Sequence, residues 1–208
     1  MRWHTTLTTL VLFGGALMLN GQPTDSITYY SSGDVKARGT YLNGKRQDIW
    51  TFYYPDGERN AIEPYNNGVL DGEVKYFYPS GKLQAVENWR SGVMEDSAFY
   101  YHQNGVIDKK GLFKQSSYEG QWLHHFESGV LERVISYHNG IPHGTTLVYN
   151  ENGTLIQRGA YNSGKEAGEW MFFSDSGELQ FKGSYDEGKP VGTWYKYVRG
   201  KEKIYKKY

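Results

Sequence analysis

Histidine side chains crowd one segment of the chain and are the first candidates for chemistry. His124, His125, His138 and His143 lie close together in the sequence. A structural or catalytic zinc site needs three or four ligands that converge at about 2.0–2.1 Å. Adjacent residues of a strand point to opposite faces, so His124 and His125 diverge, while the other two fall at the far end of the predicted hairpin. We therefore expect no metal site and no cofactor.

Nucleophilic and acid–base chemistry is also weakly indicated. The chain has no Gly-x-Ser-x-Gly elbow, and Ser174 and Ser176 occupy a turn. A catalytic carboxylate pair would occur at one place, whereas here the acidic residues recur at strand ends and connectors, which is typical of a solvated rim. These residues include Glu58, Asp71, Glu95, Glu119, Asp186 and Glu187. We expect the protein not to be an enzyme, and a hydrolytic or glycan-active site is the remaining alternative.

Aromatic side chains are the strongest candidates for binding. They make up 16% of the chain, and 19 of them are tyrosines. One set directly follows another ring in each unit, so by strand alternation it points to the opposite face. The predicted binding residues are this set, Tyr53, Phe77, Tyr101, Tyr149, Phe173 and Tyr197. Exposed, they would form a partner surface; the alternative is ordinary packing.

Two series of glycines define the elements that must position these rings. The first series recurs every 24 residues without a slip, at Gly33, Gly57, Gly81, Gly105, Gly129, Gly153 and Gly177. The second follows eleven residues behind, at Gly44, Gly68, Gly92, Gly140, Gly164 and Gly188, with Ser116 in the remaining place. Such a period indicates one small unit that is copied end to end and must stack on its neighbours.

Each unit has the pattern of a β-hairpin. In the clearest unit, residues 168–192, an aromatic-rich stretch leads into a Ser-Gly turn, and Leu179, Phe181, Gly183 and Tyr185 then alternate up to another turn. Alternation on both sides of a glycine-containing turn predicts paired strands. The fold class is therefore all-β: an elongated, single-layer antiparallel array of about seven hairpins, or around fourteen strands.

Three columns at the 24-residue spacing supply the predicted core. The first is aromatic in every unit, from Tyr41 to Tyr185, and the second is aliphatic except at Arg59. The third contains Trp50, Trp122, Trp170 and Trp194 together with Val74, Ala98 and Thr146. Residues that recur in an array lie beside their own copies, so these columns predict ladders of stacked side chains. Glycines such as Gly159 and Gly183 leave room for a neighbouring tryptophan to lie flat over the backbone.

The composition excludes several classes of partner. Lysine and arginine number 23, aspartate and glutamate number 23, and no basic patch suggests nucleic acid. The lysines at the C-terminus are expected to be a solvated end. The absence of cysteine excludes disulfides and thiolate metal sites.

The N-terminus has the pattern of a targeting segment. Arg2 precedes an uncharged apolar run, Leu7–Leu19, which is too short for the roughly 20 residues of a membrane-spanning helix. We expect a signal peptide over residues 1–21, cleavage near Gly21-Gln22, and an exported repeat domain over residues 22–208 that does not insert into a membrane. The alternative is an uncleaved anchor or a docked helix.

The repeated unit resembles a known family. The segments Tyr161–Trp170 and Tyr185–Trp194, each an aromatic residue, a turn glycine followed by lysine, a second glycine and a tryptophan, are similar to the MORN repeat, in particular its bacterial variant in YwqK-type antitoxin-like proteins. The resemblance covers about residues 29–197, and segment 92–120 departs from it at Asp96, Ala98 and Ser116. It implies an elongated array of β-hairpins used for contact with proteins or membranes, and it carries no catalytic residue.

Together these features predict a non-enzymatic, exported scaffold that binds a protein or a cell-surface polymer through an aromatic-rich face. The alternative is an antitoxin-like or immunity protein that neutralises a toxin by direct binding. A peripheral lipid binder is a third possibility, and it would require a basic face.

Overall fold

A computed structural model of the chain describes residues 21–208, which form strands and turns without helices. The expected signal peptide, apart from Gly21, lies outside the described residues. The strands are β1 (Thr24–Tyr29), β2 (Val35–Leu42), β3 (Lys45–Tyr53), β4 (Arg59–Asn66), β5 (Val69–Leu70), β6 (Gly72–Phe77), β7 (Leu83–Arg90), β8 (Val93–Tyr101), β9 (Ile107–Lys114), β10 (Ser117–His125), β11 (Leu131–His138), β12 (Ile141–Tyr149), β13 (Leu155–Asn162), β14 (Lys165–Phe173), β15 (Leu179–Asp186), β16 (Lys189–Val198) and β17 (Lys201–Lys207).

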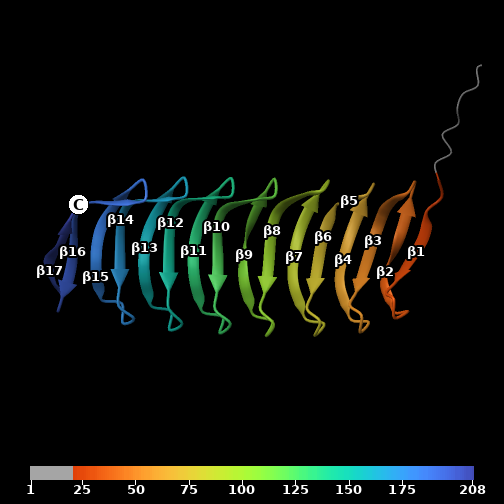
Figure 1. The fold of residues 1–208 in the computed structure, drawn as a ribbon, viewed down its shortest axis with the longest axis horizontal. Coiled ribbons are helices and arrows are strands. Elements are labelled where there is room, and N and C mark those ends of the chain that lie inside the picture. Colours follow the sequence, from red (N-terminus) through yellow and green to blue (C-terminus); the bar gives the residue numbers. More distant parts are fainter. Residues whose placement is uncertain (1–20) are drawn as a thin grey trace, which may run out of the picture.

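The strands lie side by side in chain order as one long antiparallel sheet (Figure 1). Each strand pairs with the next except at β5 and β6, which both pair with β4. The all-β, single-layer array predicted from the sequence is therefore confirmed. The sheet has 17 strands rather than about fourteen, because β1 and β17 extend it at its two ends and Asp71 separates β5 from β6.

Two kinds of turn alternate along the two long edges of the sheet. At one edge, two-residue turns such as Asn43-Gly44 have positive φ at both positions, 51° and 73°, which is the geometry of a type I′ hairpin. At the other edge, Gly57 has φ 89° and its N–H donates to the carbonyl of Tyr54 at 3.0 Å. The two glycine series thus mark the two edges.

The core lies on one face of the sheet, which we call the tryptophan face. Trp50, Trp122, Trp170 and Trp194 are at most 7% exposed. Around Trp50, the Tyr41 ring meets the indole edge-on at 5.0 Å and the Phe52 ring stacks beside it at 6.2 Å. The same arrangement recurs around Trp170 with Tyr161 and Phe172. Rows of rings on either side therefore cover the indoles without a second layer.

On the neighbouring strand of the same unit, the residue opposite the tryptophan column is small where the column residue is large, and large where the column residue is small. Gly39, Gly111, Gly159 and Gly183 each lie under an indole, and a Cβ on any of them would overlap that ring. Where the column holds a smaller residue, the opposite residue is larger. These pairs are Glu63 with Val74, Glu87 with Ala98 and Ile135 with Thr146. The irregular units therefore keep a filled core by exchanging the large and small partners.

Hydrogen bonds between neighbouring units hold both edges in register. Backbone N–H groups of the two-residue turns donate to the preceding unit, as from Gly92 to the carbonyl of Leu70 at 2.7 Å. At the other edge, the hydroxyls of Tyr30, Tyr54 and Tyr78 donate to the carbonyls of Tyr53, Phe77 and Tyr101 at 2.6–2.8 Å. His102 makes the equivalent contact to His125, at 2.9 Å. This series of side-chain hydrogen bonds ends at Phe126, whose side chain has no polar atom.

Candidate binding surface on the second face

The predicted binding residues all lie on the face opposite the tryptophans, which we call the second face. Tyr53 directly follows Phe52, whose ring stacks on Trp50, and successive strand residues point to opposite faces. All members of this ring row are half-buried rather than covered: Tyr53, Phe77, Tyr101, Tyr149, Phe173 and Tyr197. Three of them accept the inter-unit hydrogen bonds through their carbonyls, so their backbone is fixed in place.

Aliphatic side chains pair with the ring row. Phe77 is opposite Leu83, Tyr101 is opposite Ile107, and the pairing continues along the sheet to Phe173 and Leu179. This is the aliphatic column that the sequence placed in the core. It lies beside the rings on the second face instead, because a β-bulge at each pairing shifts the register by one residue.

A third, central row runs beside the rings on the same face. Each member pairs with the next across the sheet: Arg38, Thr51, Ile62, Lys75, Val86, Phe99, Lys110, Leu123, Val134, Leu147, Arg158, Met171, Lys182 and Tyr195. The ring row, its aliphatic partners and this central row together form what we call the second-face stripe.

Arginines lie over two of the rings in the stripe. The Arg38 guanidinium is 5.4 Å from the centre of the Tyr53 ring, and Arg59 is 5.1 Å from that of Phe77. Both distances are within cation–π range. Arg38 and Tyr53 also line a hollow of about 320 Å³ together with Ile27 and Val35. Arg59, which interrupts the aliphatic column in the sequence, therefore contributes a charge to the stripe.

His125 occupies the place in the ring row between Tyr101 and Tyr149. Its Nδ1 atom is buried without a hydrogen-bond partner. Burial lowers the pKa of His125, and the nearby charge of Lys110 lowers it further. His124 lies on the tryptophan face, where burial also lowers its pKa. These two histidines thus occupy positions that hold Tyr100 and Tyr101 in the preceding unit.

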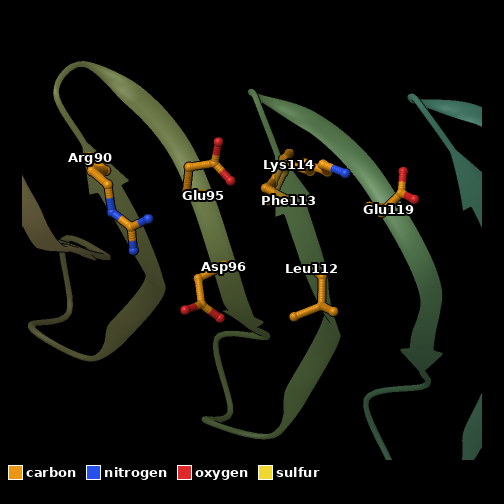
Figure 2. A pocket seen from close by; sticks show the side chains of 7 residues that line it. All are labelled: Arg90, Glu95, Asp96, Leu112, Phe113, Lys114 and Glu119. Carbon is orange, nitrogen blue, oxygen red and sulfur yellow. The ribbon is translucent and has the colours of Figure 1, made fainter.

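Segment 92–120 contains a second candidate, a hollow of about 330 Å³ on the second face. Figure 2 shows Glu95 and Asp96 on β8, the Leu112–Lys114 segment on β9, and Arg90 and Glu119 on the strands to either side. The two glutamates stabilise turns: Glu95 accepts from the Gln115 N–H at 3.0 Å, and Glu119 accepts from the Asn139 N–H at 3.0 Å. The latter bond, together with His138 at 3.1 Å, lowers the pKa of Glu119. The hollow therefore offers few uncommitted polar groups.

The tryptophan face carries a group of carboxylates that the sequence analysis missed. Glu87 is 8% exposed and accepts from the Tyr100 hydroxyl at 2.8 Å and the Trp89 indole at 3.2 Å. Glu63 accepts from Tyr65 at 2.6 Å. Burial, together with Glu87, raises the pKa of Tyr100. The sequence could have indicated this group, because Glu63 and Glu87 occupy a position of the 24-residue repeat that otherwise holds glycine or isoleucine.

The basic residues of the central row were also missed. They recur irregularly in the sequence, and only the alignment of both strands of each unit brings them into one row. As for metals, among residues 21–208 no three His, Asp or Glu side chains are grouped closely enough to bind an ion. The same residues contain no helix that is long and apolar enough to cross a membrane.

Comparisons with known proteins identify the repeat. Residues 49–67, 70–90, 142–163 and 167–187 match the family model described as MORN repeat variant. No curated protein matches the chain. Two crystal structures, of TcdB2-TccC3-Cdc42 and of TcdB2-TccC3, align with 88% of this chain at 12% identity and TM-scores of 0.23 and 0.22. The chain spans 13% and 14% of the length of those two chains.

Proposed function

Because this chain is a MORN-repeat protein, we propose that it is a non-enzymatic binding scaffold whose contact surface is the second-face stripe. The observation that carries the proposal is the ring row. Its rings are half-buried although the described residues form only one layer, so nothing within residues 21–208 covers that face. A long row of partly exposed rings is typical of an interaction surface.

The absence of catalysis is part of the proposal. The carboxylates with the most distinctive surroundings, Glu63 and Glu87, are engaged by hydroxyl and indole donors. Glu95 and Glu119 hold turns. These roles leave binding, rather than acid–base chemistry, as the function that the side chains support.

We further propose that the protein is exported and that its partner is a protein or a polymer of the cell surface. The basis is the charged start and short apolar run of residues 1–21. Mass spectrometry of the chain recovered from cell fractions tests this proposal. A chain that begins near Gln22 outside the cytoplasm would support export, whereas an intact chain in the cytoplasm would refute it.

The test of the contact surface is a comparison of two matched triple variants. Tyr53→Ser, Tyr101→Ser and Tyr149→Ser remove three rings from the stripe. Ile141→Ser, Tyr205→Ser and Tyr208→Ser remove three large side chains outside the stripe that are 49–54% exposed. A specific partner should be captured by the wild type and by this control variant and lost by the stripe variant. Equal capture by all three, with circular dichroism confirming that each is folded, would show that the ring row is ordinary packing.

The identity of the captured partner separates the two functional classes. A structural protein or surface polymer supports the scaffold proposal. A toxin whose activity falls when it binds the chain would instead identify an antitoxin-like immunity protein.

A further inference from the structure

The two faces of the sheet carry opposite charges along their central rows. On the second face the charged members of the central row are all basic: Arg38, Lys75, Lys110, Arg158 and Lys182. The corresponding row on the tryptophan face contains Glu63 and Glu87 and no basic residue. The whole chain has a formal net charge of zero at pH 7. These two rows therefore differ in charge, although the second face also carries Glu73 and Glu169 beside its central row, and Arg46 and Lys109 lie over indoles on the tryptophan face.

The ring row and its aliphatic partners continue this pattern between β2 and β16. Their only charged member is Arg59, which takes the place of an aliphatic residue. From β2 to β16 the three rows of the stripe thus contain basic, aromatic, aliphatic and a few neutral polar side chains. At the C-terminal end, the Tyr197 hydroxyl donates to Glu202 of β17. Such a surface attracts a partner that is both acidic and able to pack against rings.

Several of the basic groups are available to a partner. Lys75 pairs with Glu73 at 2.8 Å, and Lys182 pairs with Glu169 at 2.7 Å. Within residues 21–208, the remaining four have no carboxylate within 4.0 Å: Arg38, Arg59, Lys110 and Arg158. The three arginines are exposed and Lys110 is half-buried. Arg38 and Arg158 each line a hollow of the second face, of about 320 and 160 Å³; Asp34 also lines the first hollow, and Glu169, which pairs with Lys182, lines the second.

The spacing of these groups points to an extended, linear anion. At about 4.7–4.9 Å per strand, the central row from Arg38 to Lys182 is about 55–60 Å long, with its basic groups about 10–20 Å apart. The rings recur at every second strand, about 9–10 Å apart. An extended polymer with a repeating acidic group can engage such a row at several points at once, which multiplies weak contacts into measurable affinity.

We propose that the second-face stripe binds an acidic polysaccharide, a linear chain of sugar rings that bear carboxylates. The C–H face of a sugar ring can pack on the electron-rich face of an aromatic side chain, and guanidinium groups bind carboxylates through charge-assisted hydrogen bonds. Nucleic-acid-binding surfaces have clustered lysines and arginines, whereas the basic groups of this row lie about 10–20 Å apart. A folded acidic protein would have to match a row nearly 60 Å long. The inference rests on the proposed function, because it specifies the partner of the same stripe.

The experiment measures binding of the full-length protein to immobilised polygalacturonate at several salt concentrations. The neutral control is the fully methyl-esterified polymer, which has the same sugar backbone without charge. Vesicles of anionic phospholipid and single-stranded oligodeoxythymidine are the competing anions. We expect binding to polygalacturonate that weakens as salt rises, and binding at least about tenfold weaker to the ester and to both competitors.

Two variants with the same loss of charge locate the site. Arg38→Gln, Lys110→Gln and Arg158→Gln remove three unpaired basic groups of the stripe. Lys45→Gln, Lys189→Gln and Lys201→Gln remove three exposed lysines that directly follow two-residue turns. The stripe variant should bind polygalacturonate about tenfold more weakly, and the turn variant should bind like the wild type. Five of the six substituted side chains are exposed and Lys110 is half-buried; since such charges contribute little to folding, both variants should melt near the wild-type temperature. If the triple stripe variant does not fold, Arg158→Gln alone serves in its place.

Any other result overturns the inference. Equal weakening by both variants would mean attraction to net charge rather than to the stripe, and equal binding of the ester would exclude the carboxylates. Tighter binding of vesicles or of the oligonucleotide would assign the basic row to that partner instead. If no polysaccharide binds, but the ring variant of the capture experiment still loses a protein partner, the inference fails while the proposed scaffold function stands.

Discussion

The indole of Trp170 lies directly against the backbone of Gly159 on the neighbouring strand, where a Cβ would overlap the ring. Gly159→Ala should therefore destabilise the protein by about 1–3 kcal/mol, as overpacking of a core does. Urea unfolding followed by tryptophan fluorescence measures the change.

The control for this prediction is a double-mutant cycle. In a Trp170→Ala background the ring is gone, so Gly159→Ala should have a much smaller effect on the free energy of unfolding. Equal effects in both backgrounds would mean that the glycine is needed for some reason other than the indole.

Asp96 is expected to be a stabilisable position. It has φ 70°, at a place in the unit where Gly120, Gly168 and Gly192 have φ 66–67°. A side chain in this left-handed conformation is strained, so Asp96→Gly should raise the free energy of unfolding by up to about 1 kcal/mol. The matched change Asp175→Gly, in an exposed turn without positive φ, should lower it by about 0.5–1 kcal/mol, because glycine adds freedom to the unfolded chain. Thermal melts of both variants test the contrast, and a loss of stability in Asp96→Gly would contradict it.

Acid should destabilise the protein through His124 and His125. Burial lowers the pKa of both in the folded state, so below the unfolded value of about 6.5 the unfolded chain binds more protons than the folded one. The contribution of these histidines to stability is thus fully present above about pH 6.5 and lost as the pH falls toward their folded pKa values.

The test replaces both histidines by tyrosine, the residue that stands in the corresponding places of the preceding unit as Tyr100 and Tyr101. Urea midpoints from about pH 7.5 to about pH 5.5 should fall in the wild type and change less in the double variant. Parallel slopes would show that other groups dominate the acid response.

Alkali should destabilise the protein through Tyr76. Its pKa is raised by burial first and by Glu87 second. Above about pH 10 the unfolded chain loses this proton while the folded chain keeps it, so stability is present below that pH and falls as the pH rises. Tyr76→Phe should flatten the fall, and an equally steep fall in this variant would show that other groups dominate the alkaline response. Melting temperatures above pH 9, with phenolate absorbance on the same samples, decide between these outcomes.

Much of the fold could be predicted because its determinants are local and repeated. Gly57 and Gly44 have positive φ because the turns in which they lie require it. Turns of the same kind that recur every 24 residues indicate an array of hairpins. The tryptophan–glycine contact was foreseen for the same reason, since both members sit at fixed places in one unit. The histidines were correctly placed on opposite faces by simple alternation.

The parts that could not be predicted depend on how one strand meets the next. The sequence put the aliphatic column in the core, yet bulges at each pairing place Leu83 and its copies beside the rings of the second face. In this unit Glu87 and Ala98 replace the glycine and tryptophan that other units hold at these places. The replacement can be recognised only from the strand pairing, which puts Glu87 opposite Ala98. The basic row is likewise invisible at the 24-residue spacing, because Arg38, Lys75 and Lys110 belong to different strands of different units.

The amino-acid sequence by itself determined the all-β repeat, its two kinds of turn and its tryptophan ladder, because glycine positions and alternation act within a single hairpin. Only the tertiary structure decided which side chains share a face and a row, and hence that Arg38, Lys110 and Arg158 lie along one line with aromatic and aliphatic neighbours. That line is a property of strand register, which is fixed by pairing across the whole sheet rather than within any one unit.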